Sequence, residues 1–241
     1  MNVKVIAVCF AEGRIQHDAR FPNHNQDIET KEGKLDMLKQ IVTYEMTNDA
    51  GVPLDILIVN SDVGFEEGNK WLESIKGKET LNGHIWTVTR DNIGGSFGAY
   101  NDAFTGDREK IYDNWLFTED DIVVGGRDYY RRIMNKYRAR KNAGFIALIG
   151  LSRHPMGTHA HGGVGFTTRE ILENIVHNNN GELPHYKGGW DKDKVIEEGE
   201  VKFTNFIENK IGKDIITFYE LDEWDFKTKL CVPYYNFTDI H

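Results

Sequence analysis

Three consecutive acids, Glu119, Asp120 and Asp121, stand between two short apolar segments of this chain. Because adjacent carboxylates repel one another, such a group lies either in a solvated turn or opposite a positive charge. Carboxylate oxygens are ligands that Mg²⁺ and Mn²⁺ prefer, and a bound ion can hold the phosphates of a second molecule. Thr118 and Asp121 also have the spacing of a helix cap, but no helical period begins before the glycines that follow. The acids therefore predict a metal-assisted phosphate site, with a solvated acidic turn as the alternative.

Polar residues and glycines also follow two other apolar runs. Asn60 and Asp62 come directly after one run, and would contact a base or ribose or form a plain Asx turn. The segment 90–98 follows another run and carries two glycines before a helix, where free amides near the positive helix end suit a phosphate. A tight strand-to-helix turn explains these glycines equally well. Within the same segment, Arg90 would pair with a diphosphate or with its neighbour Asp91.

These groups need a fold that brings them together, and the hydrophobic pattern predicts one. Short β-branched runs alternate with apolar residues at helical spacing, which is typical of β-α-β units and a mostly parallel sheet flanked by helices. In such a sheet, ligands bind at the carboxyl ends of the strands, where the acids and the glycine turn fall. The expected strands are residues 3–10, 54–59, 85–88, 115–117 and 145–151, and the expected helices are 35–46, 71–75, 96–104 and 129–137.

The second half of the chain is less periodic and richer in glycine, histidine and aromatic residues. No linker or internal repeat interrupts the sequence, so we expect one α/β domain over residues 1–241, with a nucleotide-type half up to about residue 121 and a substrate-facing half from 122 on. The polar stretch 11–33 is unusually long for a connection and is expected to order over a bound ligand. The expected elements of the second half are strands 164–166 and 215–218 and helices 168–176 and 195–209.

Composition narrows the class of protein. The formal net charge is −9 over 241 residues, which argues against a general nucleic-acid binder and against an anionic membrane surface as partner. No stretch reaches the roughly 18 apolar residues of a membrane helix. The chain begins in a strand without a signal-peptide pattern, so we expect a cytoplasmic protein. Cys9 and Cys231 lie in apolar surroundings and are expected to be small core residues without a disulfide.

Five short motifs follow one another along the chain. They are Asn92-Ile93-Gly94-Gly95, Glu119-Asp120-Asp121, His161-Gly162-Gly163-Val164-Gly165-Phe166 with Arg169-Glu170, Gly188-Gly189-Trp190-Asp191, and Glu200 followed by Gly212. In this order they resemble the motifs of the family 2 glycosyltransferases of the GT-A fold, and the likeness extends from about residue 3 to residue 216. The resemblance implies a nucleotide-sugar site over a parallel sheet and inverting transfer of a sugar from a nucleoside-diphosphate donor to a saccharide hydroxyl, assisted by Mn²⁺ or Mg²⁺. The half after residue 121 would then be the acceptor side.

The resemblance also implies roles for single residues. Glu119 would lie near the ribose and share the metal, and Asp121 would hold the metal. Glu200 is the first candidate for the base that takes the acceptor proton, and Asp191 is the second. The remaining expected contacts are His161 and Trp190 with the acceptor and, with the donor, Ala11, Glu12, Asn60, Asp62, Arg90, Asn92, Gly95, Glu119 and Asp120.

Three departures from the family pattern leave alternatives open. The first acid is Glu119 where aspartate is usual, the connection 11–33 is longer, and Val201 replaces the aspartate of the family's Glu-Asp pair. Because that aspartate often supplies the base, Val201 also fits a relative that binds a nucleotide sugar or glycan without turnover. A sugar-phosphate nucleotidyltransferase is less favoured, because the segment 11–14 is a poor match to the Gly-rich, basic loop expected after the first strand of that class.

Overall fold

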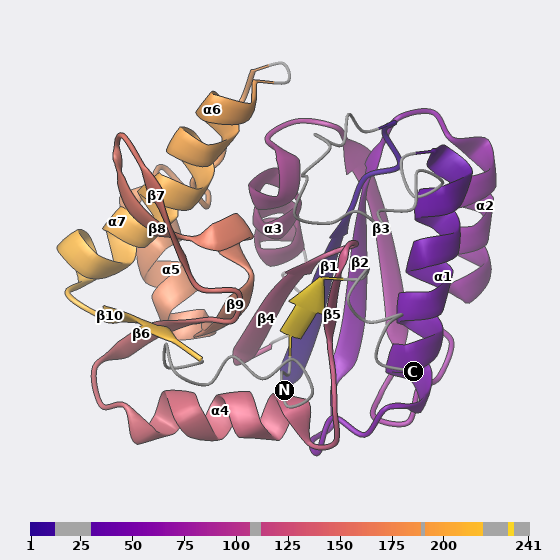
Figure 1. Ribbon diagram of the computed structural model, residues 1–241, viewed down its shortest axis with the longest axis horizontal. Coiled ribbons are helices and arrows are strands. Elements are labelled where there is room, and N and C mark those ends of the chain that lie inside the picture. Colours follow the sequence, from indigo (N-terminus) through magenta and orange to yellow (C-terminus); the bar gives the residue numbers. More distant parts are fainter. Residues whose placement is uncertain (13–29, 107–111, 189–190, 219–230, 234–241) are drawn as a thin grey trace, which may run out of the picture.

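A seven-stranded sheet forms the centre of the computed structural model, which describes residues 1–12, 30–106, 112–188, 191–218 and 231–233 (Figure 1). The strand order is β10-β6-β9-β4-β1-β2-β3, and each neighbouring pair is parallel except those that β9 makes with β4 and β6. The mostly parallel α/β sheet expected from the sequence is therefore confirmed. The strands are β1 (Asn2–Val8), β2 (Asp55–Asp62), β3 (Ile85–Asp91), β4 (Asn114–Glu119), β6 (Ala143–Ala147), β9 (Gly165–Thr168) and β10 (Asp214–Thr217).

Helices cover both faces of the sheet, because successive side chains of a strand point to opposite sides. Val3 and Val5 of β1 pack with α3, α5 and α7 on one face, whereas Ile6 and Val8 pack with α1 and α2 on the other. Helix α4 covers the part of the second face formed by β4, β6 and β9. No helix in the described ranges is long and apolar enough to span a membrane. The helices are α1 (Lys31–Thr47), α2 (Glu66–Ile75), α3 (Gly95–Gly106), α4 (Tyr129–Ala139), α5 (Arg169–Asn178), α6 (Lys192–Val195) and α7 (Lys202–Asn205).

The helix expected at 195–209 is part of a longer helical stretch, Lys192 to Ile211, in which π-helical turns alternate with α-helix. The π-helical turns are η3 (Ile196–Val201) and η4 (Phe206–Ile211). Such turns are rare and often occur at functional sites. The first of them contains Glu200, the candidate base.

Two small sheets differ from the expectation. The strand expected at 145–151 ends at Ala147, and Leu151 instead begins a hairpin of β7 (Leu151–His154) and β8 (Gly157–Ala160). Gly150 just before it has a φ of 121°, a conformation that side chains disfavour, so the chain can turn there. The second small sheet pairs β5 (Ile122–Val124) with β11 (Cys231–Pro233) in antiparallel sense.

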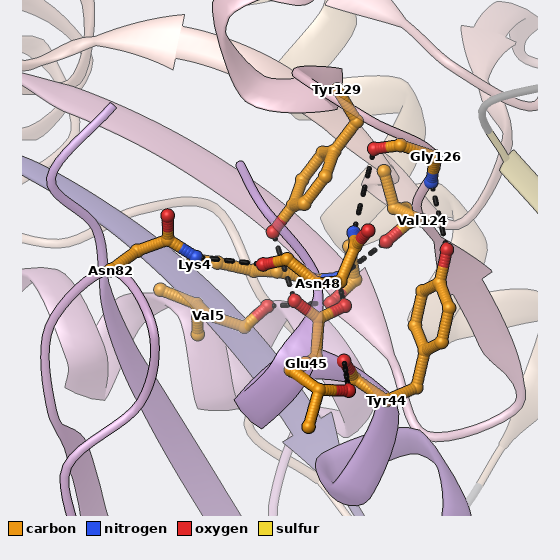
Figure 2. A network of polar contacts seen from close by, with 11 residues as sticks. Lys4, Val5, Tyr44, Glu45, Asn48, Asn82, Val124, Gly126 and Tyr129 are labelled. Carbon is orange, nitrogen blue, oxygen red and sulfur yellow. Dashed lines mark hydrogen bonds and ion pairs between the residues drawn. The ribbon is translucent and has the colours of Figure 1, made fainter. Parts of the chain in front are cut away.

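A charged network is buried towards the amino-terminal end of β1 (Figure 2). The ammonium group of Lys4, whose side chain is fully buried, donates to Glu45 of α1 and, at 3.2 Å, to the Val124 carbonyl of β5. The second carboxylate oxygen of Glu45 accepts a hydrogen bond of 2.9 Å from the Tyr129 hydroxyl of α4. Burial, and then Glu45, raise the pKa of Tyr129 well above its ordinary value, so this hydroxyl stays a donor. The network ties four elements together with its two charges paired.

The direction of β9 decides which segment meets the acids. Because β9 is antiparallel to β4, its first residue, Gly165, pairs with Phe117 near the end of β4. The turn that precedes β9, η2 (His161–Gly163), therefore lies at the same edge as residues 119–121. Thr118 is fully buried within β4, and its hydroxyl donates to the backbone of β1 at 2.9 Å, which excludes the helix-cap alternative.

Candidate active site

The three acids lie at the carboxyl edge of the sheet, as the sequence pattern predicts. Glu119 pairs with Ala7 in the register of β4 and β1, and the Asp120 amide donates to the Ala7 carbonyl at 3.1 Å. The Asp120 carboxylate accepts the Cys9 amide at 3.1 Å, so it also closes the end of β1. Cys9 is half-buried and not a core residue. Glu119 and Asp120 are half-buried as well, and Asp121 is exposed.

A glycine turn brings a fourth acid to the same place. Gly162 and Gly163 have φ values of 60° and 64°, in the left-handed region that favours glycine. A Cβ atom at Gly162 would lie 3.1 Å from the Glu119 carboxylate, so a side chain here would require Glu119 to shift. The Gly162 amide donates to Glu200 Oε2 at 2.7 Å, and the Ser96 hydroxyl donates to Glu119 Oε1 at 2.5 Å. Four separate segments of the chain thus meet at one edge.

The three acids of the β4 edge are difficult to ionise together. Burial, and then Asp121, raise the pKa of Glu119 well above its ordinary range. The same two causes raise the pKa of Asp120 to about 7, although the Cys9 amide and Lys34 favour its charged form. Asp121 is open to solvent on one side, yet the surrounding protein removes enough hydration to raise its pKa too. In the part of the chain that the structure describes, no lysine or arginine forms an ion pair with these acids.

Two histidines border the acids. His159 Nε2 is 3.3 Å from Glu200 Oε2, and His161 Nδ1 is 2.9 Å from the Ser152 hydroxyl oxygen. Burial lowers the pKa of both imidazoles, and the charge of Asp121 opposes this shift at His161. Burial raises the pKa of Glu200 to about 7, although its hydrogen bond from a backbone amide favours the charged form. A carboxyl group that titrates near neutral pH suits proton transfer.

A divalent cation would relieve the crowding of negative charge at this edge. No group of three or more histidine, cysteine or carboxylate side chains within the described ranges forms a ready metal site. Mg²⁺ sites commonly use only one or two carboxylates and take the remaining ligands from substrate phosphates and water. Exposed Asp121 and its neighbour Glu119 match that pattern. The donor set therefore fits a metal that binds together with a phosphate ligand.

A chain of side-chain amides lies where β2 ends and α2 begins. The Asp62 carboxylate accepts the side-chain amide of Asn69 at 3.0 Å, and the Asn69 oxygen accepts that of Asn60 at 2.7 Å. Because the hydrogen bond from Asn69 lowers the pKa of Asp62, this carboxylate only accepts, and the orientation of both amides follows. The oxygen of Asn60 is then a buried acceptor without a partner among the described residues. Such a group costs about 1–3 kcal/mol, so an N–H or O–H donor would stabilise it.

Asp62 also accepts the Gly64 amide at 2.9 Å, which is the Asx turn of the alternative interpretation.

Arg90 is engaged within the protein. Its guanidinium group donates to Asp102 of α3, to the Ser61 hydroxyl at 3.0 Å and to the Ile93 carbonyl at 2.8 Å. Its acidic partner is therefore Asp102 and not the neighbouring Asp91. These bonds brace the turn that leads into α3, and contact between Arg90 and a diphosphate stays a prediction.

The other expected donor contacts surround the same edge. The turn at 94–95 has φ values of 77° and 58°, in the left-handed region that favours glycine. Asn92 and Glu12 are exposed, and the Ala11 carbonyl accepts the Lys34 ammonium group. Their contacts with a ligand stay predictions. Lys34 has no sequence signal that marks it, because it lies at the start of a helix far along the chain from the acids.

The two candidate bases and the neighbouring Val201 lie in different surroundings. Asp191 is exposed and caps α6 by accepting a backbone amide of that helix at 3.2 Å. Val201 is buried, whereas Glu200 reaches the acid edge. Trp190, expected at the acceptor, lies outside the described residues, as do residues 13–29 of the expected lid.

A cavity of about 360 Å³ lies beside the turn at 94–95. The two are in contact, because a Cβ atom at Gly94 would lie 2.7 Å from the Tyr186 carbonyl oxygen. None of Glu119, Asp120, Asp121 and Glu200 lines this cavity, so it is a hollow separate from the carboxyl edge, formed by the second half of the chain. Its lining residues are Asn179, Asn180, Glu182, Leu183, Pro184, His185, Tyr186, Lys187, Gly188, Glu198 and Lys202.

Solved structures similar to this chain include a mannosyltransferase and a glycosyltransferase. The mannosyltransferase PcManGT from Pyrobaculum calidifontis, in complex with GDP-Man and Mn²⁺, is 18% identical with a TM-score of 0.48, over 90% of this chain and 54% of that one. GlyE from Streptococcus pneumoniae TIGR4 is 10% identical with a TM-score of 0.43, over 94% and 47% of the two chains. TarS from S. aureus is 10% identical with a TM-score of 0.38, over 76% and 30%. The chain thus spans about half or less of the length of these proteins. No protein-family model matches the chain, and no curated protein matches it.

Proposed function

We propose that this chain transfers a sugar from a nucleoside-diphosphate sugar to a hydroxyl of a saccharide acceptor, with a GT-A-type donor site at the carboxyl edge of the sheet. One observation carries the proposal. Glu119, Asp120, Asp121 and Glu200 converge at this edge, and no lysine or arginine of the described ranges pairs with them. Carboxylates held together in this way favour a cation, and a cation at a strand edge beside a glycine turn favours a diphosphate.

Donor binding follows from the groups around the acids. The phosphates would lie over the turn at 94–95, where α3 begins. The buried acceptor oxygen of Asn60 would receive an N–H group of the base or an O–H group of the ribose. Mn²⁺ or Mg²⁺, held by Asp121 and Glu119, would neutralise the charge that develops on the departing nucleoside diphosphate.

Glu200 supplies the base in this proposal. Its carboxylate removes the proton of the acceptor hydroxyl while that oxygen attacks the anomeric carbon and the bond to the diphosphate breaks, so the sugar configuration inverts. The Gly162 amide holds the carboxylate at 2.7 Å, and a pKa of about 7 leaves a large fraction of it ionised at neutral pH. Asp191, the second candidate, is exposed and already caps α6.

Nucleotide binding is the first test. Calorimetric titration of UDP, GDP and dTDP, with and without Mn²⁺, should reveal affinity that depends on the metal, and the matching nucleotide sugars should then release nucleoside diphosphate. Asp121→Asn should remove the metal-dependent part of the affinity without unfolding the protein. Binding without turnover would indicate a binding module, and pyrophosphate as product would indicate a nucleotidyltransferase. Failure of every nucleoside diphosphate to bind, with or without metal, would overturn the proposal.

The base is tested by a matched pair of isosteric variants. Glu200→Gln should keep the donor affinity and lower the transfer rate by at least about 100-fold, the lower figure for loss of a general base. Asp191→Asn should transfer at close to the parent rate. If Asp191→Asn loses transfer and Glu200→Gln keeps it, Asp191 is the base. Full activity in both variants would refute a mechanism in which either carboxylate acts as the base.

A further inference from the structure

His159 is a nearly buried imidazole that the mechanism above does not use. Its exposed fraction is 3%, and its Nε2 atom lies 3.3 Å from Oε2 of Glu200. That same oxygen accepts the Gly162 amide at 2.7 Å. The other oxygen, Oε1, has no hydrogen-bond partner within the described ranges. Both contacts therefore fall on one oxygen of the carboxylate and leave the other available.

The ring of His159 is held by its own hairpin. It stands on β8 opposite Ser152 of β7, and its Nδ1 atom is 3.4 Å from the Gly157 carbonyl oxygen. The next amide, of Ala160, donates to the Thr204 hydroxyl of α7 at 3.1 Å. The hairpin is thus attached to the helical stretch that carries Glu200. Because the imidazole of His159 is fixed by a different element, it can set the side-chain conformation of Glu200 on the helical stretch.

The proton positions follow from the partners. A carbonyl oxygen only accepts, so the Gly157 contact places a proton on Nδ1 of His159. Nε2 and Oε2 would then face each other with lone pairs unless a proton lies between them. A second proton, on Nε2, makes the contact attractive and keeps the carboxylate of Glu200 ionised, so that Oε1 is the oxygen free to take the acceptor proton. The negative charge of Glu200 favours this imidazolium form, against the burial that lowers the pKa of His159.

We infer that His159 is a positioning residue for Glu200: together with the Gly162 amide it grips Oε2, so that Oε1 is the oxygen presented to the acceptor hydroxyl. This inference rests on the proposed function, in which Glu200 is the base. His159 itself touches neither donor nor acceptor in this arrangement. A purely structural His159 would instead pack the hairpin without affecting the orientation of Glu200.

Two variants separate these roles. His159→Leu fills a similar volume without a donor, and His159→Gln keeps an N–H group near the position of Nε2. With Mn²⁺ and the best nucleotide-sugar donor, His159→Leu should lower kcat by about 10-fold or more, a part of the loss typical for a base, while donor KM stays unchanged. His159→Gln should recover most of the rate. Adding His159→Leu to Glu200→Gln should cost nothing further, because the two residues act as a unit.

A spectroscopic measurement tests the contact without turnover. In the nitrogen NMR spectrum of labelled imidazoles, Glu200→Gln should shift the Nε2 resonance of His159, and Asp191→Asn should not. An unchanged Nε2 resonance in Glu200→Gln would overturn the inference. So would parent kcat in His159→Leu when Glu200→Gln has lost it. Parent activity in Glu200→Gln itself would instead refute the proposed base, and the NMR result would still decide whether the pair exists if His159→Leu fails to fold.

Discussion

Two groups of charged side chains, one buried and one partly open to solvent, lie at opposite ends of the same central sheet. Towards the amino-terminal end of β1, Lys4 and Glu45 neutralise each other, and the Tyr129 hydroxyl and a carbonyl of β5 take up further hydrogen bonds. At the carboxyl edge, residues 119–121 and Glu200 crowd four carboxylates together without a lysine or arginine partner in the described part of the chain. One group is complete within the protein, and the other is not.

The contrast distinguishes charges that hold the fold together from charges that await a ligand. Burial of an ion is costly unless a partner and hydrogen bonds compensate, and the Lys4 network has both. The acids at the other end respond in another way, because their pKa values rise towards or above neutrality. Ionised carboxylates crowded in this way do not stabilise the fold at neutral pH. A positively charged ligand therefore explains these four acids better than a structural role does.

The largest effect is expected at the paired end. Lys4→Met should lower the free energy of unfolding by about 3–5 kcal/mol, because it leaves the Glu45 carboxylate buried without its counter-charge. Urea denaturation of the variant and the parent protein measures this loss. The double variant Lys4→Met/Glu45→Gln should lose less, since the amide is neutral and can still accept from Tyr129. A double variant as unstable as the single one would show that charge pairing is not what the network provides.

Ligand binding should act only at the unpaired end. Mn²⁺ with the best-binding nucleoside diphosphate, at 100 times its dissociation constant, should raise the free energy of unfolding by about 2.7 kcal/mol. Asp121→Asn should abolish this gain, whereas Lys4→Met/Glu45→Gln should keep it in full. Loss of the gain in the Lys4 double variant would mean that the two ends are coupled.

The metal-free protein should become less stable as pH rises. The pKa values of Glu200 and Asp120 are about 7, above the ordinary values near 4, so the folded state holds protons that the unfolded chain releases. Their contribution is present below about pH 4 and is lost as pH rises through about 7, a fall of about 2 kcal/mol after allowance for solvent screening. Denaturation at a series of pH values measures the slope. Glu200→Gln should reduce it, and an unchanged slope would place its origin elsewhere.

The smallest effect is expected at the glycine turn. Gly162→Ala should cost about 1–2 kcal/mol of stability, since an alanine is strained at a φ of 60°. Its methyl group would also lie 3.1 Å from Glu119, so metal-dependent nucleotide affinity should fall. Gly181→Ala is the matched control, because Gly181 has a φ of 87° and open space around it. Equal nucleotide affinity in the two variants would show that the turn at Gly162 does not contribute to nucleotide binding.

Hydrophobic pattern predicts the parallel half of this fold well. Strands buried on both faces read as nearly continuous apolar runs, so β1, β2 and β4 are evident from the sequence, and the position of the acids follows from the end of β4. The same pattern cannot mark where β6 ends, because apolar residues continue past Ala147 into the turn. Nor does it indicate that the four-residue β9 runs antiparallel, since strand direction leaves no trace in hydrophobicity.

The side-chain contacts within the two charged groups cannot be predicted from the sequence either, because the partners lie far apart along the chain. Lys4 in a strand is ordinarily exposed, and its burial depends on Glu45, which lies 41 residues away. Glu200 meets the Gly162 amide across 38 residues. Ser96 reaches Glu119 across 23 residues, and only its place after the glycine turn suggests a site residue. Such pairs exist only once the sheet order and the helix register are set.

The direction in which the Glu200 side chain points depends on the number of residues in the helical stretch before it, which includes the π-helical turn η3. An α-helix advances about 100° per residue, and a π turn accommodates one residue more in each hydrogen-bonded ring. Deleting a single residue between Lys192 and Glu200 would rotate the carboxylate by about 100°, away from the Gly162 amide. Single-residue insertions and deletions should therefore not be tolerated between Lys192 and Glu200. In the evolution of this fold, the length of that helix and its active-site carboxylate would be inherited together.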